Sequence, residues 1–238
     1  MALTASSCAF GVPAYSFLRT ASAFRRRSAA LAAWAALGHF LTHISVTGTD
    51  AGYPAVAVNG NYIGIVWSER IQDNLQGPIY LQGTTNGVNL APRQEVAPSP
   101  SVNDESWRPD IAADSTGRMH IVWENLFQGT TERLFYRTCT IGSTCQNTEQ
   151  IVSKNDAVDF PQLALGLTRG GVHVVWQEKG TGTEGSIMYA GRVTTNSWST
   201  PFALASVTLD EDLPPAAPAI AITTDGVNDY VHVVWVSN

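Results

Sequence analysis

Acidic side chains in polar loops are the groups of this 238-residue chain that are best suited to chemistry. Glu69, Glu124 and Glu178 each follow a tryptophan by one or two residues, and Asp104 and Asp156 lie ahead of the next similar segment. Two carboxyl groups about 5–10 Å apart serve retaining or inverting glycosidases, whereas carboxylates spread around a rim suit cations or sugar hydroxyls. Acidic loops also simply keep a protein soluble, and the spacing selects no pair.

Trp107 and Phe127 are aromatic side chains of the same loops. Such rings stack on sugars or, equally well, cover the edge of a sheet. We take these two residues, with the five acids above, as candidate binding residues.

Three histidines stand at one repeated position, three residues before a tryptophan: His120, His173 and His232. Zinc requires its ligands about 2.1 Å from a single centre, whereas equivalent positions of successive repeats stand apart. We therefore predict framework histidines that bond to backbone groups between repeats, with no metal and no cofactor.

The charge of the chain is unevenly distributed. Of 14 basic residues, four precede residue 46, so the remainder holds 10 basic and 20 acidic residues, a formal charge of −10. A body of that sign repels phosphate, which argues against a nucleic-acid partner.

Residues 1–45 read as a separate leader that resembles a signal or anchor. Arg25, Arg26 and Arg27 precede an apolar run over residues 28–41, the layout of a secretory signal. The run is shorter than the roughly 20 residues of a membrane-spanning helix. We expect a short helical leader and export, so that the membrane is reached only through this segment; a transit peptide or a helix packed on the body are the alternatives.

Cys139 and Cys145 enclose five residues that read as a hairpin turn. Cysteines that flank such a turn face each other across the strands, and a disulfide between them needs an oxidising compartment. The pair therefore favours export.

A repeat becomes visible when the tryptophans are aligned. Trp67, Trp123, Trp176 and Trp235 are 56, 53 and 59 residues apart, and each closes a segment that begins near a proline. A period near fifty in strand-rich units is typical of propeller blades.

Each unit resolves into four short strands separated by Gly, Asn and Asp turns. The first follows the proline, the second ends at the tryptophan, and two more follow a polar loop. The second strands are apolar on both faces, which suits a blade between two neighbours. We predict an all-β propeller over residues 46–238 with about three and a half four-stranded antiparallel blades, incomplete or open. Self-association to complete the ring is one expected partnership.

The turns after the third strands carry the resemblance to a known family. Thr84-Thr85-Asn86-Gly87 and Thr194-Thr195-Asn196-Ser197-Trp198 stand at corresponding positions. With the proline–strand–tryptophan units, they resemble the Asp box of bacterial sialidase-like, BNR-type β-propeller repeat proteins. Asn86 and Asn196 stand near the place of the aspartate, so the repeats are degenerate.

The resemblance implies a sialidase-type site only in part. Sialidases grip a substrate carboxylate with three arginines, the first in an Arg-Ile-Pro motif. Trp107-Arg108-Pro109 is the nearest match and lacks the middle residue, which leaves Arg108 as the single catalytic candidate. Arg137 and Arg192 occupy equivalent positions of two repeats, which indicates a structural role.

We therefore expect a non-catalytic binding or scaffold module, with a carbohydrate or another protein as the ligand. It would be exported from a bacterium to the cell surface or beyond. The alternative is a partial sialidase-like glycoside hydrolase.

Overall fold

The computed structural model describes residues 2–7, 50–72, 75–97, 104–127, 131–154, 157–168, 170–192, 197–209 and 215–236. This part of the chain is all-β. Within it, no helix is long and apolar enough to cross a bilayer.

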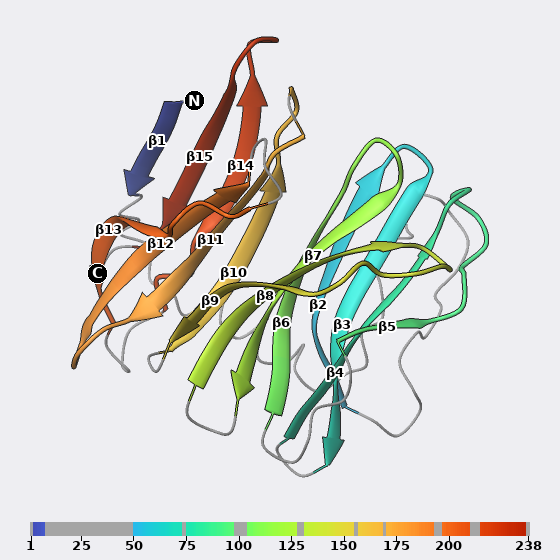
Figure 1. Ribbon diagram of the computed structural model, residues 1–238, viewed down its shortest axis with the longest axis horizontal. Coiled ribbons are helices and arrows are strands. Elements are labelled where there is room, and N and C mark those ends of the chain that lie inside the picture. The colour runs from blue at the N-terminus through green and yellow to red at the C-terminus, as the bar shows by residue number, and fades with distance from the viewer. Residues whose placement is uncertain are drawn as a thin grey trace, which may run out of the picture.

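Three four-stranded antiparallel sheets follow one another along the chain, and we call them blades 1, 2 and 3 (Figure 1). Blade 1 comprises β2 (Asp50–Asn59), β3 (Tyr62–Gln72), β4 (Leu75–Thr84) and β5 (Gln94–Ala97). Blade 2 comprises β6 (Asp104–Ala113), β7 (Arg118–Phe127), β8 (Thr131–Thr140) and β9 (Glu149–Lys154). Blade 3 comprises β10 (Val158–Leu165), β11 (Val172–Lys179), β12 (Glu184–Arg192) and β13 (Phe202–Thr208).

The fourth sheet, which we call blade 4, has the strand order β1-β15-β14. It comprises β14 (Ala219–Thr224), β15 (Asp229–Trp235) and β1 (Ala2–Ser7).

The described start of the leader, β1, is a strand and gives no support to a helical leader. Ala2–Ser7 pairs in parallel with β15, from Ala2 opposite Tyr230 to Ser7 opposite Trp235. An extended segment at this edge satisfies backbone groups of β15 that would otherwise be unpaired. The basic cluster and the apolar run of the leader lie outside the described residues.

The second strands of blades 1, 2 and 3 are buried on both faces, whereas β15 of blade 4 is buried on one face and exposes Val234 on the other. On β7, Met119, Ile121 and Trp123 pack with blade 1, whereas Val122 on the opposite face packs with blade 3. The alternation follows from the period of two along a strand. It confirms the predicted equivalence of the four tryptophans, which are 0–9% exposed: Trp67, Trp123, Trp176 and Trp235.

The repeated histidines differ from the expectation in their partners. His120 Nδ1 lies 2.7 Å from the Tyr136 hydroxyl and His173 Nδ1 lies 2.7 Å from the Tyr189 hydroxyl. Both pairs join the second strand to the third strand of the same blade, so the partner is a side chain and not a backbone group between blades. Burial lowers the pKa of both histidines.

The repeated arginines tie blades 2 and 3 each to the blade before it. Arg137 on β8 donates to the carbonyl of Val96 on β5. Arg192 on β12 donates to both carboxylate oxygens of Glu149 on β9, at 2.7 and 2.8 Å. The shared task supports the structural role expected from the repetition.

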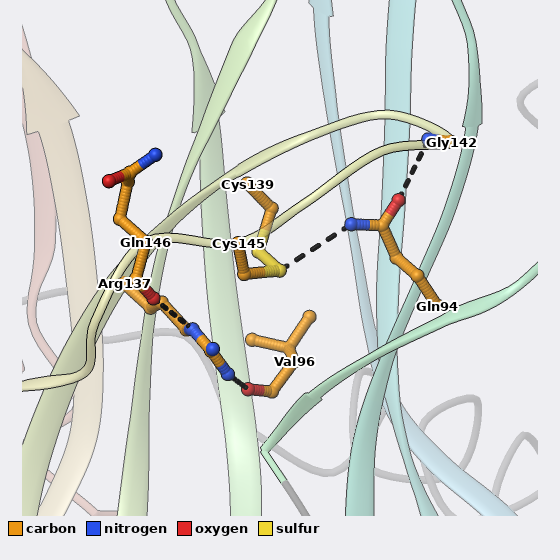
Figure 2. The surroundings of a disulfide bond; sticks show 7 residues. All are labelled: Gln94, Val96, Arg137, Cys139, Gly142, Cys145 and Gln146. Atoms are coloured by element: carbon orange, nitrogen blue, oxygen red, sulfur yellow. Dashed lines mark hydrogen bonds between the residues drawn. A yellow bond between two sulfur atoms is a disulfide. The ribbon is translucent and has the colours of Figure 1, made fainter.

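A disulfide reinforces the outer contact between blades 1 and 2 (Figure 2). Cys139 and Cys145 are joined with an S–S distance of 2.03 Å. Gln94 of blade 1 donates to Cys145 Sγ at 3.4 Å and accepts from the Gly142 backbone at 2.8 Å. The hairpin closed by the disulfide is therefore one side of an inter-blade contact.

Reduction of this disulfide should lower the free energy of unfolding by about 2 kcal/mol, because a short loop is no longer closed in the unfolded chain. Urea denaturation with and without reductant measures the change. The Cys139→Ser/Cys145→Ser variant is the control, because its midpoint should not respond to reductant. Equal midpoints for the oxidised and reduced native protein would contradict the prediction.

Candidate functional site

A left-handed residue before a proline interrupts the first strand of three blades. The φ angles are +52° at Tyr53, +43° at Arg108 and +54° at Phe160. The pairing with the second strand shifts at each place, so the strand continues through a bulge. Proline cannot donate a ladder hydrogen bond, and a bulge accommodates it. The first strands therefore begin well before the prolines, where the sequence alone predicted their start after them.

These three equivalent residues come together on adjacent first strands. The Arg108 guanidinium carbon lies 5.6 Å from the centre of the Tyr53 ring and 4.3 Å from that of the Phe160 ring. The ring of Trp107 lies 5.5 Å from the same carbon. Three aromatic rings thus surround one cation, an arrangement that cation–π attraction stabilises.

Two carboxylates bind that cation. Arg108 Nη1 donates to Glu124 Oε2 at 3.0 Å and also to Asp159 Oδ1. Glu124 Oε1 accepts a hydrogen bond from the Phe160 backbone at 2.5 Å. The cluster therefore joins β6, β7 and β10, and it spans the boundary between blades 2 and 3.

The members of the cluster differ in exposure. The side chain of Glu124 is 2% exposed, whereas those of Arg108 and Asp159 are each 25% exposed. Tyr53, at 38%, is the most accessible of the aromatic residues beside them. A solute can therefore contact Arg108, Asp159 and Tyr53, whereas Glu124 is buried and contacts only the protein, through its bonds to Arg108 and the Phe160 backbone.

The electrostatics follow from this burial. Burial raises the pKa of Glu124 well above its usual range, although the charge of Arg108 opposes the rise. Burial lowers the pKa of Arg108, but the charges of Glu124 and Asp159 outweigh it, so its pKa lies above the usual value. Two carboxylates already neutralise the guanidinium, so it is poorly suited to bind a third.

The cluster retains some hydrogen-bonding capacity. Among the described residues, Arg108 Nε is buried without a hydrogen-bond partner. No group of three or more His, Cys, Asp or Glu side chains in the described ranges is arranged to hold a metal ion. The chemistry on offer is therefore carboxylate and guanidinium hydrogen bonding beside aromatic faces.

The structure brings together three of the residues selected from the sequence, Trp107, Arg108 and Glu124. Glu69 lies elsewhere, where it accepts from Arg93 at 2.8 Å and from the Trp67 indole at 3.1 Å. Glu178 lies on β11 opposite Val158.

The remaining three candidates are described in part or not at all. Asp104 and Phe127 pair across the ends of β6 and β7, but their side chains lie outside the described residues. Asp156 lies outside them entirely.

Tyr53, Asp159 and Phe160 were missed among the candidate site residues, although the sequence carries a signal for two of them. Tyr53 and Phe160 precede Pro54 and Pro161 as Arg108 precedes Pro109. The residue before each repeated proline thus marks the site, and Asp159 is its neighbour in the chain.

A third carboxyl group, that of Asp110, lies two residues after Arg108 on β6. Asp110 Oδ2 accepts a hydrogen bond from the Leu163 backbone at 2.8 Å, which links β6 to β10. Burial raises its pKa to about 6, against the hydrogen bonds from Leu163 and Ile111 that lower it.

One comparison with a solved structure supports a propeller-like fold, and two others are weaker. The Hadza microbial sialidase Hz136 superimposes with a TM-score of 0.52 at 11% identity, over 71% of this chain and 39% of its own. The Bombyx mori GH32 β-fructofuranosidase BmSUC1 gives 0.47 at 15% identity, over 79% of this chain and 44% of its own. The exo-β-1,3-galactanase 1,3Gal43A of Clostridium thermocellum gives 0.35 at 12% identity, over 80% of this chain and 54% of its own.

The chain thus spans about two fifths to one half of the length of these three proteins. No protein-family model matches the sequence, and no curated protein matches it. At these identities the similarity to the sialidase shows the fold and nothing of the activity.

Arg108→Met should lower the free energy of unfolding by about 3 kcal/mol or more at pH 7, because it leaves Glu124 buried beside Asp159 without a cation. Adding Glu124→Gln to this variant should restore part of the loss. Arg93→Met at the more exposed Glu69 pair is the matched control, with an expected loss of about 1 kcal/mol. Urea denaturation of the native chain and the three variants gives the free energies of unfolding. Equal losses for Arg108→Met and Arg93→Met would refute the cluster's role.

Asp110→Asn should remove a pH dependence of stability. A folded pKa of about 6 against an ordinary value of about 3.9 means that stability falls as pH rises from about 4 to about 6 and stays lower above it. Asparagine keeps the acceptor for the Leu163 backbone without this decline. The stability of the variant relative to the native chain should therefore increase by about 1–3 kcal/mol between pH 4 and pH 7.5. Urea denaturation across that range provides the test, and a pH-independent difference would contradict it.

Proposed function

We propose that the chain is a non-catalytic β-propeller module that binds a neutral carbohydrate at the Arg108 cluster. The observation that carries the proposal is the convergence of three aromatic rings and two carboxylates on one guanidinium. Rings that stack on a sugar face and charged groups that bond its hydroxyls are the two contacts a saccharide needs.

The partial exposure of the cluster supports this use. Tyr53 offers an accessible ring face, and Asp159 and Arg108 are each one-quarter exposed beside it. A sugar ring over Tyr53 would place hydroxyls against these charges. The exposed part of the cluster is small, which favours a short saccharide or the end of a chain.

A neutral ligand suits the cluster better than a sialic acid. A sialidase arginine needs open donors for the substrate carboxylate, whereas Arg108 Nη1 already donates to both Glu124 and Asp159. Two negative charges beside one positive charge also repel an anion. The excess of 20 acidic over 14 basic residues acts in the same direction.

We further propose that the turns after the third strands are a degenerate form of the Asp box. In the turn after β4, Asn86 Oδ1 accepts from the backbones of Val88 and Asn89 at 2.9 and 3.0 Å. The amide oxygen thereby caps the turn without a carboxylate. Such a turn serves the fold and needs no aspartate.

A partial glycoside hydrolase of sialidase-like type remains the second candidate. Glu124 and Asp159 bind the same nitrogen, so their oxygens are no more than about 6 Å apart, near the spacing of a retaining pair. The raised pKa of Glu124 is also what a general acid needs. Against this role, the guanidinium occupies the space between the two carboxylates where a sugar would react.

Export to the bacterial cell surface or beyond is part of the proposal. The disulfide between Cys139 and Cys145 supports it, because such bonds persist in oxidising compartments. A protein ligand in place of a sugar is the outcome to consider if no saccharide binds.

A matched pair of saccharides tests the proposal. Calorimetric titration with a panel of neutral oligosaccharides that includes lactose should detect binding, and sialyllactose should bind at least about tenfold more weakly than lactose. Tyr53→Ala should weaken binding by about tenfold or more, which corresponds to about 1.4 kcal/mol. Phe202→Ala is the control, because Phe202 is a 43% exposed aromatic residue on β13.

Two further results decide between the candidates. Purified protein should not turn over a fluorogenic sialoside; turnover that Arg108→Ala abolishes would establish the hydrolase. Absence of binding to every panel member at millimolar concentration would overturn the carbohydrate proposal.

A further inference from the structure

The three contacts between successive blades repeat one arrangement of side chains. The residue before each tryptophan faces the following blade, and Val66, Val122 and Val175 at this position are all 0% exposed. Two residues before each valine, on the same face of the strand, is a glycine or a histidine. This residue pairs with an alanine of the first strand: Gly64 with Ala57, His120 with Ala112, and His173 with Ala164.

Blade 4 presents the same face to solvent. Val234 precedes its tryptophan and is 43% exposed, and His232 lies opposite Ala221 in the register seen in blades 2 and 3. Ala221 and His232 are both exposed, as is Ala219 opposite Val234. The face therefore has the residues that receive a following blade, and none of the described residues covers these positions.

Blade 1 presents the complementary face. On the first strands, Ile111 and Leu163 face the preceding blade and are 5% and 6% exposed. Val56 is their equivalent, because each pairs with the residue two before its tryptophan. Val56 is 46% exposed and Val58 on the same face is 63% exposed.

The blade 1 face is accessible along its first strand. On the second strand, β3, Ile65 and Trp67 are 1% and 0% exposed, with Ala51, Tyr80 and Leu90 packed against them. The accessible part is thus the portion around Val56 and Val58. These valines and the blade 4 residues carry no formal charge, so pairing the two faces desolvates no ion.

We propose that two copies of this chain associate head to tail, with the blade 4 face of each on the blade 1 face of the other. The internal contacts of the chain already form the first-strand part of this interface three times, with a valine on one side and an aliphatic residue of the next first strand on the other. An interface between two different faces closes into a ring or continues as a filament. The described part of each copy has four sheets, so two copies supply eight from these residues, within the roughly four to eight blades of closed propellers.

The mass of the full chain in solution tests the proposal. Light scattering after size-exclusion chromatography should give twice the 25.6 kDa of one chain. Val234→Arg on blade 4 and Val56→Arg on blade 1 should each reduce the mass to that of one chain, because a buried charge opposes either side of the contact. Val88→Arg, at a 69% exposed valine between β4 and β5, is the matched control and should keep the double mass.

The variants also test the direction of assembly. All three positions are exposed, so the near-ultraviolet circular dichroism of each variant should match that of the native chain; the two one-chain variants should unfold cooperatively but at a somewhat lower temperature, because association stabilises the native state. Mixing Val234→Arg with Val56→Arg should restore a two-chain species, because the mixture contains one intact face of each kind. A two-chain species in Val56→Arg alone would indicate a contact of like faces and overturn the head-to-tail arrangement. A monomeric native chain up to about 100 μM, or masses that grow without limit, would overturn the closed ring.

Discussion

The fold depends on burying the apolar second strands against neighbouring sheets, most completely in blades 2 and 3, which have a sheet on each side. A strand that is apolar on both faces is stable only when both faces are covered, and burial of a valine or larger side chain contributes about 1.5–3 kcal/mol. In blades 2 and 3 the tryptophan of the second strand packs against the preceding blade, and the valine before it packs on the opposite face, toward the following blade. The arginine ties, the disulfide and the position of the Arg108 cluster all presuppose blades already stacked in this way.

Strained backbone places the candidate site at equivalent points of that stack. A non-glycine residue with positive φ costs of order 1–3 kcal/mol, and it occurs before the proline in three blades. The repetition puts three side chains at the same level on adjacent first strands. Their identities then differ, Tyr53, Arg108 and Phe160, so a repeated scaffold produces a single cluster.

The spacing of the tryptophans was enough to predict successive four-stranded sheets, because one period of the repeat equals the length of chain in one blade and its connections. The site was harder to predict, since Arg108 and Asp159 are 51 residues apart and meet only when blades 2 and 3 stack. The bulges were missed because proline was taken as the start of a strand. The extended conformation of Ala2–Ser7 was not predicted, because it depends on pairing with β15, which lies more than 200 residues away in the chain.

The arginine ties have a consequence for how the molecule opens. Arg137 and Arg192 each reach back to the adjacent blade, so cooperativity passes along the stack from neighbour to neighbour. In a single copy without its partner the array is linear, so units at the ends have one stabilising neighbour and those in the middle have two. Local fraying then begins at the outer blades, and amide hydrogens of β2 and β14 exchange with solvent before those of β7. The boundary between blades 2 and 3, which contains Arg108, therefore belongs to the slowest-exchanging part of the chain.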